Sequence, residues 1–240
     1  RKLSETGLFA DVAKQTPAPG VVPFDIRAPM WAEGATGRRF VAMTGVSDGL
    51  STKLSQNKNK NRLDSKVTWP KDTVLAKTIS MRMDSGDAAS AKKIETQVLH
   101  YDGEAWAAYS YRWNDDATDA DLVGPHGDER RLTLVGGIHA GGQHTHTWRF
   151  HSRAECMRCH NSWSGFTLGF QPQQLTDNSA HTLTSLGLID ADYSKRSEAR
   201  LSNPHDESLS LNSRARSWLH ANCAHCHRQH GGGSVPLMVN

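Results

Sequence analysis

Cysteine is scarce in this chain of 240 residues, and long hydrophobic runs are absent. No stretch approaches the roughly 20 consecutive apolar residues that a membrane-crossing helix needs, which excludes a helical membrane span. The formal net charge is only +3, from 28 Lys and Arg against 25 Asp and Glu, so charge gives no reason to expect nucleic-acid binding. Four cysteines are too few for a disulfide scaffold. The length allows one or two domains.

The first 150 residues have a pattern typical of β-strands. Short apolar or alternating runs are separated by turn-forming residues, as in antiparallel sheets. The segment Tyr101-Asp102-Gly103 has the Asp-Gly chemistry of a tight hairpin. The alternation that follows puts Tyr109, Tyr111 and Trp113 on one face of a strand. We expect strands over residues 38–44, 73–83, 93–100, 104–113, 130–138 and 144–150.

Two polar loops interrupt this pattern. Residues 51–66 carry five basic side chains among Asn, Gln and Ser, which indicates a solvated excursion. Residues 114–121 carry four aspartates, and calcium is conceivable there because hard cations take several oxygen ligands. The spacing of an EF-hand is missing, so a polar surface turn is the favoured interpretation. Trp31, Trp69 and Trp148 lie in or beside the expected strands, and we expect them to pack in the core.

The character of the sequence changes after Phe150. Ser152 and Glu155 have the Ser-x-x-Glu spacing of a capping box, which predicts a helix start. A second helix is expected over residues 209–221 from the spacing of its apolar side chains. The predicted fold class is therefore α+β. An N-terminal antiparallel β-rich domain, residues 1–150, is followed by a mostly helical region, residues 151–240.

All four cysteines belong to two copies of one motif, C-x-x-C-H, which is the attachment signature of c-type haem. Two cysteines one helical turn apart can form thioethers with the two vinyl groups of one porphyrin. The adjacent histidine can then ligate the iron from the proximal side. The sequence therefore predicts two covalently bound haem c groups. Their residues are Cys156, Cys159 and His160 in the first copy, and Cys223, Cys226 and His227 in the second.

Zinc and disulfide bonds are the alternatives for these cysteines. Two C-x-x-C knuckles can supply the four ligands of a zinc site, but 63 residues separate Cys159 from Cys223, much more than in a compact ribbon. Neither zinc nor a disulfide gives a reason for a histidine after both second cysteines. Neither motif lies in the βαβ pattern of thioredoxin-like redox pairs.

Five segments carry a resemblance to a known family: residues 3–9 (LSETGLF), 94–96 (IET), 111–115 (YRWND), 152–157 (SRAECM) and 222–228 (NCAHCHR). The chain resembles a haem-c region of exported proteins from planctomycetes and marine proteobacteria. That region is often fused or adjacent to propellers that resemble quinoprotein (PQQ) sugar dehydrogenases. The resemblance implies a dihaem c-type cytochrome that passes electrons to or from such a dehydrogenase. The catalytic propeller itself is absent, so the resemblance assigns no sugar oxidation to this chain.

Each haem iron needs a sixth ligand for pure electron transfer, commonly Met, which raises the potential, or His, which lowers it. His144 and His146 share one face of the expected strand just before the first motif, and Met238 follows His227 by 11 residues. These three residues are the candidate distal ligands. Other histidines are also candidates, and the sequence does not choose among them. The alternative for His144 and His146 is that they are surface histidines without a ligand role.

The sequence thus predicts an exported cytochrome that carries single electrons between a dehydrogenase and another redox partner. Because haem c is attached to exported apoprotein, we expect a periplasmic or extracellular location. Residues 1–4 lack the apolar segment of a signal peptide, so we expect the signal to have been removed. A dihaem peroxidase-like oxidoreductase is one alternative, and it needs an open distal site with acid–base residues. A haem-bearing module that docks carbohydrate or a protein partner is another.

The segment after the second motif is short for enclosing a haem. Only residues 228–240 follow His227, whereas the related region continues further. We therefore expect one of three arrangements: a chain cut short at its C-terminus, a second haem covered by the β-rich domain, or an oligomer in which a neighbouring subunit covers it.

Overall fold

The computed structural model describes residues 1–44, 69–137, 142–189, 200–228 and 231–233. Its contacts divide the chain into two units, each built from three segments. The β unit comprises residues 1–23, 32–42 and 74–157, and the cysteine unit comprises residues 24–31, 43–73 and 158–240. Two segments from the first half of the sequence therefore belong to the cysteine unit. The basic loop expected over residues 51–66 lies outside the described residues.

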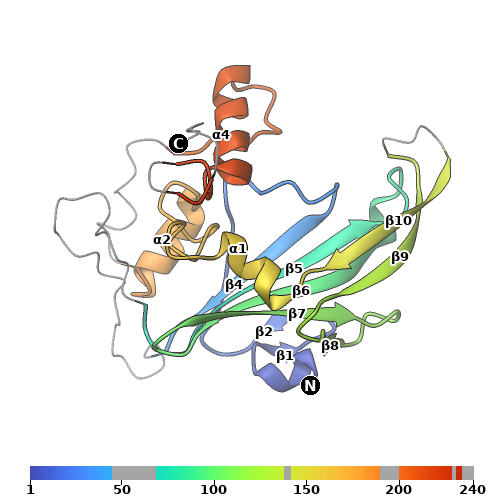
Figure 1. The fold of residues 1–240 in the computed structure, drawn as a ribbon, viewed down its shortest axis with the longest axis horizontal. Helices are drawn as coiled ribbons and strands as arrows, with labels where there is room; N and C mark the ends of the chain where they lie inside the picture. Colours follow the sequence, from blue (N-terminus) through green and yellow to red (C-terminus); the bar gives the residue numbers. More distant parts are fainter. Residues whose placement is uncertain (45–68, 138–141, 190–199, 229–230, 234–240) are drawn as a thin grey trace. The chain divides into compact units, whose positions relative to one another are not determined.

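A six-stranded sheet dominates the described part of the fold, with the strand order β3-β4-β5-β6-β7-β8 (Figure 1). Strands β4 and β5, β6 and β7, and β7 and β8 pair antiparallel. Two further pairs, β1 with β2 and β9 with β10, are also antiparallel. The strands are β1 (Phe9–Asp11), β2 (Thr16–Pro17), β3 (Val21–Phe24), β4 (Thr36–Ala42), β5 (Thr73–Arg82), β6 (Ala91–Tyr101), β7 (Trp106–Trp113), β8 (Ala120–Leu122), β9 (Asp128–Val135) and β10 (Gln143–Phe150). The six expected strands correspond to β4, β5, β6, β7, β9 and β10.

The expected hairpin joins β6 to β7, and Tyr101 lies opposite Trp106. The carboxylate of Asp102 accepts hydrogen bonds from the backbone N–H groups of Glu104 and Ala105, each at 2.8 Å. Gly103 has a φ of 105°, which suits a residue without a Cβ atom. The turn chemistry is local, and this explains why the sequence predicts it correctly.

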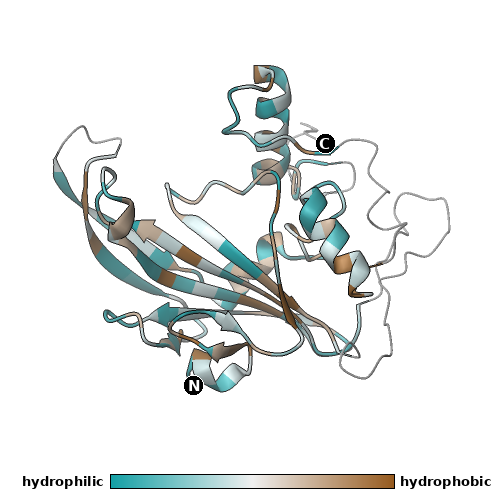
Figure 2. Ribbon diagram, turned by 180° about the vertical axis from the view of Figure 1, so that it is seen from behind, coloured by the Kyte–Doolittle hydropathy of each residue, from teal (hydrophilic) through white to brown (hydrophobic). Residues whose placement is uncertain are grey.

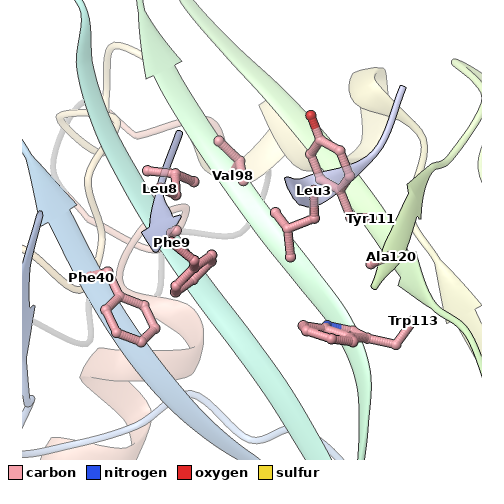
Figure 3. Close-up of a cluster of buried hydrophobic side chains, with 9 residues drawn as sticks. Leu3, Leu8, Phe9, Phe40, Val98, Tyr111, Trp113 and Ala120 are labelled. Carbon is pink, nitrogen blue, oxygen red and sulfur yellow. The ribbon is translucent and has the colours of Figure 1, made fainter. Parts of the chain in front are cut away.

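Two clusters of buried side chains form the core of the β unit. In the first, side chains of the N-terminal 3-10 turn η1 (Leu3–Thr6) and of β1 pack with residues of β4, β6 and β7 (Figure 3). Phe9 meets Phe40 edge to face at 5.0 Å, and Trp113 is fully buried with its indole N–H donating to Thr96 Oγ1 at 2.9 Å. The second cluster joins the large sheet to the β9–β10 pair and includes Trp148 and Phe150. Hydrophobic and hydrophilic residues follow one another along these strands (Figure 2).

Helices contribute less than the sequence suggested. Within the described residues, the α-helices are α1 (Arg153–Cys159), α2 (Asp177–Ser185) and α4 (Leu211–Cys223), and the described chain is mostly β. The prediction of an α+β fold with a mostly helical region over residues 151–240 is therefore wrong. Across the described residues, no helix has both the length and the apolar character that crossing a bilayer requires.

The loop after α1 explains this error. Gly165 and Phe166 adopt φ angles of 76° and 63°, which no α-helix contains. Between them and α1, the side chains of Asn161 and Ser164 bond backbone groups that a continuing helix would have used. Short polar side chains compete with the helical backbone in this way. The region consequently continues as turns rather than as helix.

A buried carboxylate also lies in the large sheet. Glu95 on β6 is 1% exposed and accepts hydrogen bonds from Ser110 Oγ at 2.7 Å, Trp148 Nε1 at 3.0 Å and Gln97 Nε2 at 3.3 Å. Burial raises the pKa of Glu95 above its ordinary value, although these three hydrogen bonds oppose the rise. The ionised form is therefore less favoured in the folded chain than in the unfolded chain.

Replacing Glu95 with Gln should change how stability depends on pH. Burial raises the pKa of Glu95 in the folded chain. The stability that Glu95 contributes is therefore complete when the pH lies below 4.5, the ordinary pKa of this group. It is lost as the pH rises through the raised pKa. We expect the wild type to lose stability relative to Glu95→Gln over that rise, measured as urea midpoints at a series of pH values. The exposed Glu104→Gln control should follow the wild type. Parallel pH profiles of wild type and Glu95→Gln would contradict the raised pKa.

Candidate functional site

The first cysteine motif begins on the short helix α1, which starts with the expected capping box. Ser152 N donates to Glu155 Oε2 at 2.8 Å, and Glu155 N donates to Ser152 Oγ at 3.2 Å. The backbone bond from Ser152 and the ion pair with Arg149 lower the pKa of Glu155 to about 2. Seven residues of helix place Cys156 and Cys159 one turn apart, on the same side of α1. The boundary between the two units falls inside this helix, after Met157.

A tight turn follows α1 and carries the motif histidine. Ser164 is buried, and its hydroxyl donates to the carbonyl oxygen of Cys159 at 2.6 Å. Asn161 N donates to Ser164 Oγ at 3.2 Å, and Ser164 N donates to Asn161 Oδ1 at 3.0 Å. These bonds fold the chain back so that Phe166 N donates to Asn161 O at 3.0 Å. The sequence analysis missed Ser164, although the dipeptide Ser164-Gly165 is a recognised turn signal.

The turn brings a backbone carbonyl to the imidazole of His160. Nδ1 of His160 lies 2.5 Å from the carbonyl oxygen of Phe166. A carbonyl oxygen can only accept, so Nδ1 carries the proton, and in the neutral ring Nε2 carries the lone pair. This is the tautomer in which a histidine ligates a metal through Nε2, with its orientation fixed by the second nitrogen. Phe166 contributes through its backbone, which is why the sequence analysis did not find it.

The second motif closes the C-terminal end of α4. The helix begins after Ser210, whose hydroxyl accepts from Ser213 N at 3.2 Å. At the other end, Cys226 N and His227 N both donate to the carbonyl oxygen of Cys223, at 3.1 and 2.9 Å. These two bonds close a further turn directly after the last residue of α4. Both motifs therefore pair a helix end with a tight turn.

Two histidines of the second motif have buried nitrogens that find no hydrogen-bond partner among the described residues. They are Nδ1 of His225 and Nδ1 of His227. Burial lowers the pKa of His225, and the nearby His227 and Arg228 lower it further. The pKa of His220 is lowered for the same reasons, with burial first and Arg228 second. The neutral form, which is the form that ligates metals, is thus favoured at His220 and His225.

Cys159 of the first motif and Cys226 of the second lie close together within the cysteine unit. Burial raises the pKa of the Cys159 thiol, and the neighbouring Cys226 raises it further. Residues that follow the first motif and residues of the second motif also line one common hollow. Its lining residues are Ser164, Leu168, Gln171, Gln174, His220, Ala221, Ala224, His225 and Arg228. The fold thus gathers two segments that are distant in sequence.

None of the four cysteines forms a disulfide, and all four are half-buried. Within the described ranges, no three His, Cys, Asp or Glu side chains converge to hold a bare metal ion. The described residues therefore contain no four-ligand arrangement of the kind that a structural zinc site uses. Cys156, Cys159, Cys223 and Cys226 remain available for attachment chemistry.

Apolar side chains near the motifs are exposed. Trp163, three residues after His160, is 55% exposed, and Trp218 on α4 is 39% exposed. Leu211 of α4 is 75% exposed, and the only buried residue of this helix is Ser217, whose hydroxyl accepts from Ser202 N at 2.8 Å. Trp31 is 62% exposed, so the expectation that it packs in the core is wrong, whereas Trp69 and Trp148 are buried.

Two of the three candidate distal ligands lie on strand β10. His144 and His146 share one face of β10, as their spacing predicts, and belong to the β unit. Nε2 of His146 lies 2.8 Å from Glu33 Oε2, as an ion-pair contact rather than a well-aligned hydrogen bond. Met238 lies outside the described residues. Distal ligation by any of the three stays a prediction.

The acidic loop 114–121 is a polar turn whose side chains bond local groups. Asn114 Oδ1 accepts from the backbone N–H groups of Thr118 and Asp119, at 3.0 and 3.2 Å. The carboxylate of Asp119 accepts from both the backbone and the hydroxyl of Ser4. Asp115 pairs with Arg130. These oxygens accept hydrogen bonds or form ion pairs within the loop and with nearby residues, and they do not converge on one point.

Comparison with protein-family models, with curated proteins and with solved structures finds no match to this chain. The resemblance to exported haem-c regions therefore stays a prediction. A function for the chain has to be argued from its own residues and their geometry.

The thiol of Cys159 should react more slowly with iodoacetamide than a free cysteine peptide at pH 8. The thiolate is the reactive form, and the pKa of this thiol is raised by burial and by Cys226. In the haem-free chain, Cys226→Ser should restore only part of the rate, because burial is the larger cause. Peptide mass spectrometry of the labelled chain measures the rate at Cys159. A wild-type rate equal to that of the peptide would contradict the burial of this thiol.

Proposed function

We propose that this protein is a dihaem c-type cytochrome that carries single electrons. The observation that carries the proposal is the His160 tautomer, fixed by the Phe166 carbonyl, within one of two C-x-x-C-H motifs. In this proposal, Cys156 and Cys159 hold the first haem and Cys223 and Cys226 hold the second. His160 and His227 are the proximal ligands. When bound, each haem supplies an iron that gains and loses one electron.

The residues of both motifs suit this chemistry. Thioether attachment needs reduced thiols, and the four cysteines are free of disulfides. It also needs two cysteines on one side of a helical turn, which α1 provides for Cys156 and Cys159. At the second motif, the buried Nδ1 of His227 has no hydrogen-bond partner in the described part of the chain, and the bonds to Cys223 O fix the backbone of the turn. An imidazole in a fixed backbone turn is oriented before a ligand binds.

Exposed apolar side chains support the same proposal. Soluble proteins rarely leave large apolar side chains exposed in groups without a binding partner. Trp163 and Trp218 flank the motifs in the sequence, and Leu211 and Leu219 of α4 are also exposed. A porphyrin is a large apolar surface that such side chains can cover, which excludes water from the iron and tunes its potential.

The protein groups around the second motif would also influence the reduction potential of the second haem. The guanidinium of Arg228 follows His227 directly and already lowers the pKa of His220 and His225. A positive charge near a haem favours the reduced iron, because reduction adds one negative charge to the site. We therefore propose that the chain sets the potential of the second haem partly through Arg228.

The proposal extends to a partner and a location. The resemblance favours a quinoprotein dehydrogenase as the electron donor, and haem c attachment favours a periplasmic or extracellular protein. Mixing the reduced donor with the oxidised cytochrome and following the haem absorbance tests the partnership.

Covalent mass is the decisive test of the proposed function. The chain, exported from a host with a haem c maturation system, should gain the mass of two haems and give a pyridine haemochrome spectrum of haem c. The paired variants Cys156→Ala/Cys159→Ala and Cys223→Ala/Cys226→Ala should each lose one haem, because each pair holds one porphyrin. A His126→Ala variant, at an exposed histidine outside both motifs, serves as the control and should keep both. An unmodified wild-type mass would refute the proposal.

Ser164 offers a second test, through the turn that holds His160. Its hydroxyl bonds the carbonyls of Cys159 and Asn161, so Ser164→Ala should loosen the turn that brings the Phe166 carbonyl to Nδ1. We expect a loss of about 1 kcal/mol in stability. A weaker bond at Nδ1 makes the imidazole a poorer donor, so the potential of the first haem should rise.

Ser185→Ala is the matched control for this change, since the Ser185 hydroxyl makes a similar backbone bond within α2, to Thr182 O at 2.9 Å. Spectroelectrochemical titration of both variants and the wild type measures the potentials. A lowered potential in Ser164→Ala, or the same shift in the control, would contradict a role for this turn in tuning the first haem.

A further inference from the structure

The chain after the second motif folds back against that motif through a run of glycines. Gly233 N donates to the carbonyl oxygen of Cys226 at 3.1 Å. A Cβ atom on Gly231 would lie 2.4 Å from the same oxygen, and one on Gly233 would lie 3.1 Å from Nδ1 of His227. Contacts this close leave no room for a side chain at Gly231 and little at Gly233. The glycine run therefore packs on the backbone of Cys226 and lies beside the ring of His227, close enough that a side chain on Gly233 would press on it.

The middle glycine of this run packs on the first motif's loop. A Cβ atom on Gly232 would lie 2.2 Å from Cζ3 and 2.8 Å from Cε3 of Trp163. Gly232 is not among the glycines with a positive φ, so the contact with the indole, and not the backbone conformation, requires glycine here. Trp163 stands three residues after His160. The indole thus packs on a segment that also lies beside the imidazole of His227.

We infer that Trp163 is a positioning residue for the second haem site, which it supports through Gly232. This inference rests on the proposed function, because it concerns how the chain sets the potential of a haem held by Cys223 and Cys226. The Trp163 ring packs against Gly232, and the neighbouring Gly233 bonds the Cys226 carbonyl and lies beside Nδ1 of His227. Groups that contact the second nitrogen of a ligating imidazole tune the metal.

The same contacts link the two motifs. His160 precedes Trp163 by three residues, and the hydroxyl of the next residue, Ser164, bonds Cys159 O. The loop that orients the first proximal histidine therefore also carries the indole that supports the second. A change at Trp163 should consequently move the potential of the second haem, although Trp163 belongs to the first motif's loop.

Three variants test this inference in the haem-loaded chain: Gly232→Ala, Trp163→Ala and the double variant. Gly232→Ala puts a methyl group against the indole and should displace the glycine run. Trp163→Ala removes the support and admits water. Each should change the ratio of reduced to oxidised second haem at a fixed potential by about fivefold. In the Trp163→Ala background, adding Gly232→Ala should have little further effect, because the clash no longer exists.

Gly169→Ala is the matched control, since a Cβ atom there meets only Ile26, at an ordinary 3.9 Å. It should leave both potentials unchanged. The paired variant Cys156→Ala/Cys159→Ala, or its counterpart at Cys223 and Cys226, assigns each potential to its haem. Trp163→Phe keeps an aromatic ring against Gly232 and should restore most of the wild-type potential.

The outcomes separate the inference from the proposed function. A wild-type chain without covalent haem overturns both. If both haems are present, an unchanged second potential in Trp163→Ala overturns the inference alone. So does an additive effect in the double variant, since it shows that the two residues act independently. A non-additive shift confined to the second haem, with rescue by Trp163→Phe, supports it.

Discussion

The hydrogen bond between His160 Nδ1 and the Phe166 carbonyl decides which nitrogen of the imidazole carries a proton. Several local features serve this one contact. The capping box at Ser152 begins α1, and this helix ends at Cys159. The hydroxyl of Ser164 then bonds back to the Cys159 carbonyl, which turns the chain so that the Phe166 carbonyl reaches the imidazole of His160. Phe166 has a left-handed backbone with φ of 63°, which is uncommon for an aromatic residue, and its carbonyl faces His160. The chemistry proposed for the first motif depends on this turn.

Local patterns were predictable from the sequence and long-range pairings were not. The hairpin at Asp102, the capping box at Ser152 and the shared face of His144 and His146 each follow from residues a few positions apart. The helical content expected after residue 150 was wrong. Hydrogen bonds from the side chains of Asn161 and Ser164 to the backbone compete with helix formation, and helix propensities do not include that competition. The Phe166 carbonyl and the Gly232 contact involve backbone atoms, which carry no residue-type signal.

Helix α4 shows how a site can shape a fold. Its side chains Leu211 and Trp218 have the spacing of an amphipathic helix, yet both are exposed, and a serine hydroxyl anchors the helix instead. A helix normally gains most of its stability from burying an apolar face. In the proposed cytochrome, a porphyrin would supply the surface that α4 lacks, and the modest 37% of hydrophobic residues in the chain would then suffice for its core.

The cysteine unit is discontinuous, since residues 24–31 belong to it together with residues beyond 157. Ala28 N donates to Gln174 Oε1 at 3.0 Å, and Gln174 Nε2 donates back to Ala28 O at 2.9 Å. Further along, Trp31 N donates to Asn222 Oδ1 at 2.8 Å, next to Cys223. A fragment starting at residue 151 would leave Gln174 buried without these partners. We therefore expect a fragment that starts at residue 151 to fold less stably than the whole chain, although it carries both motifs.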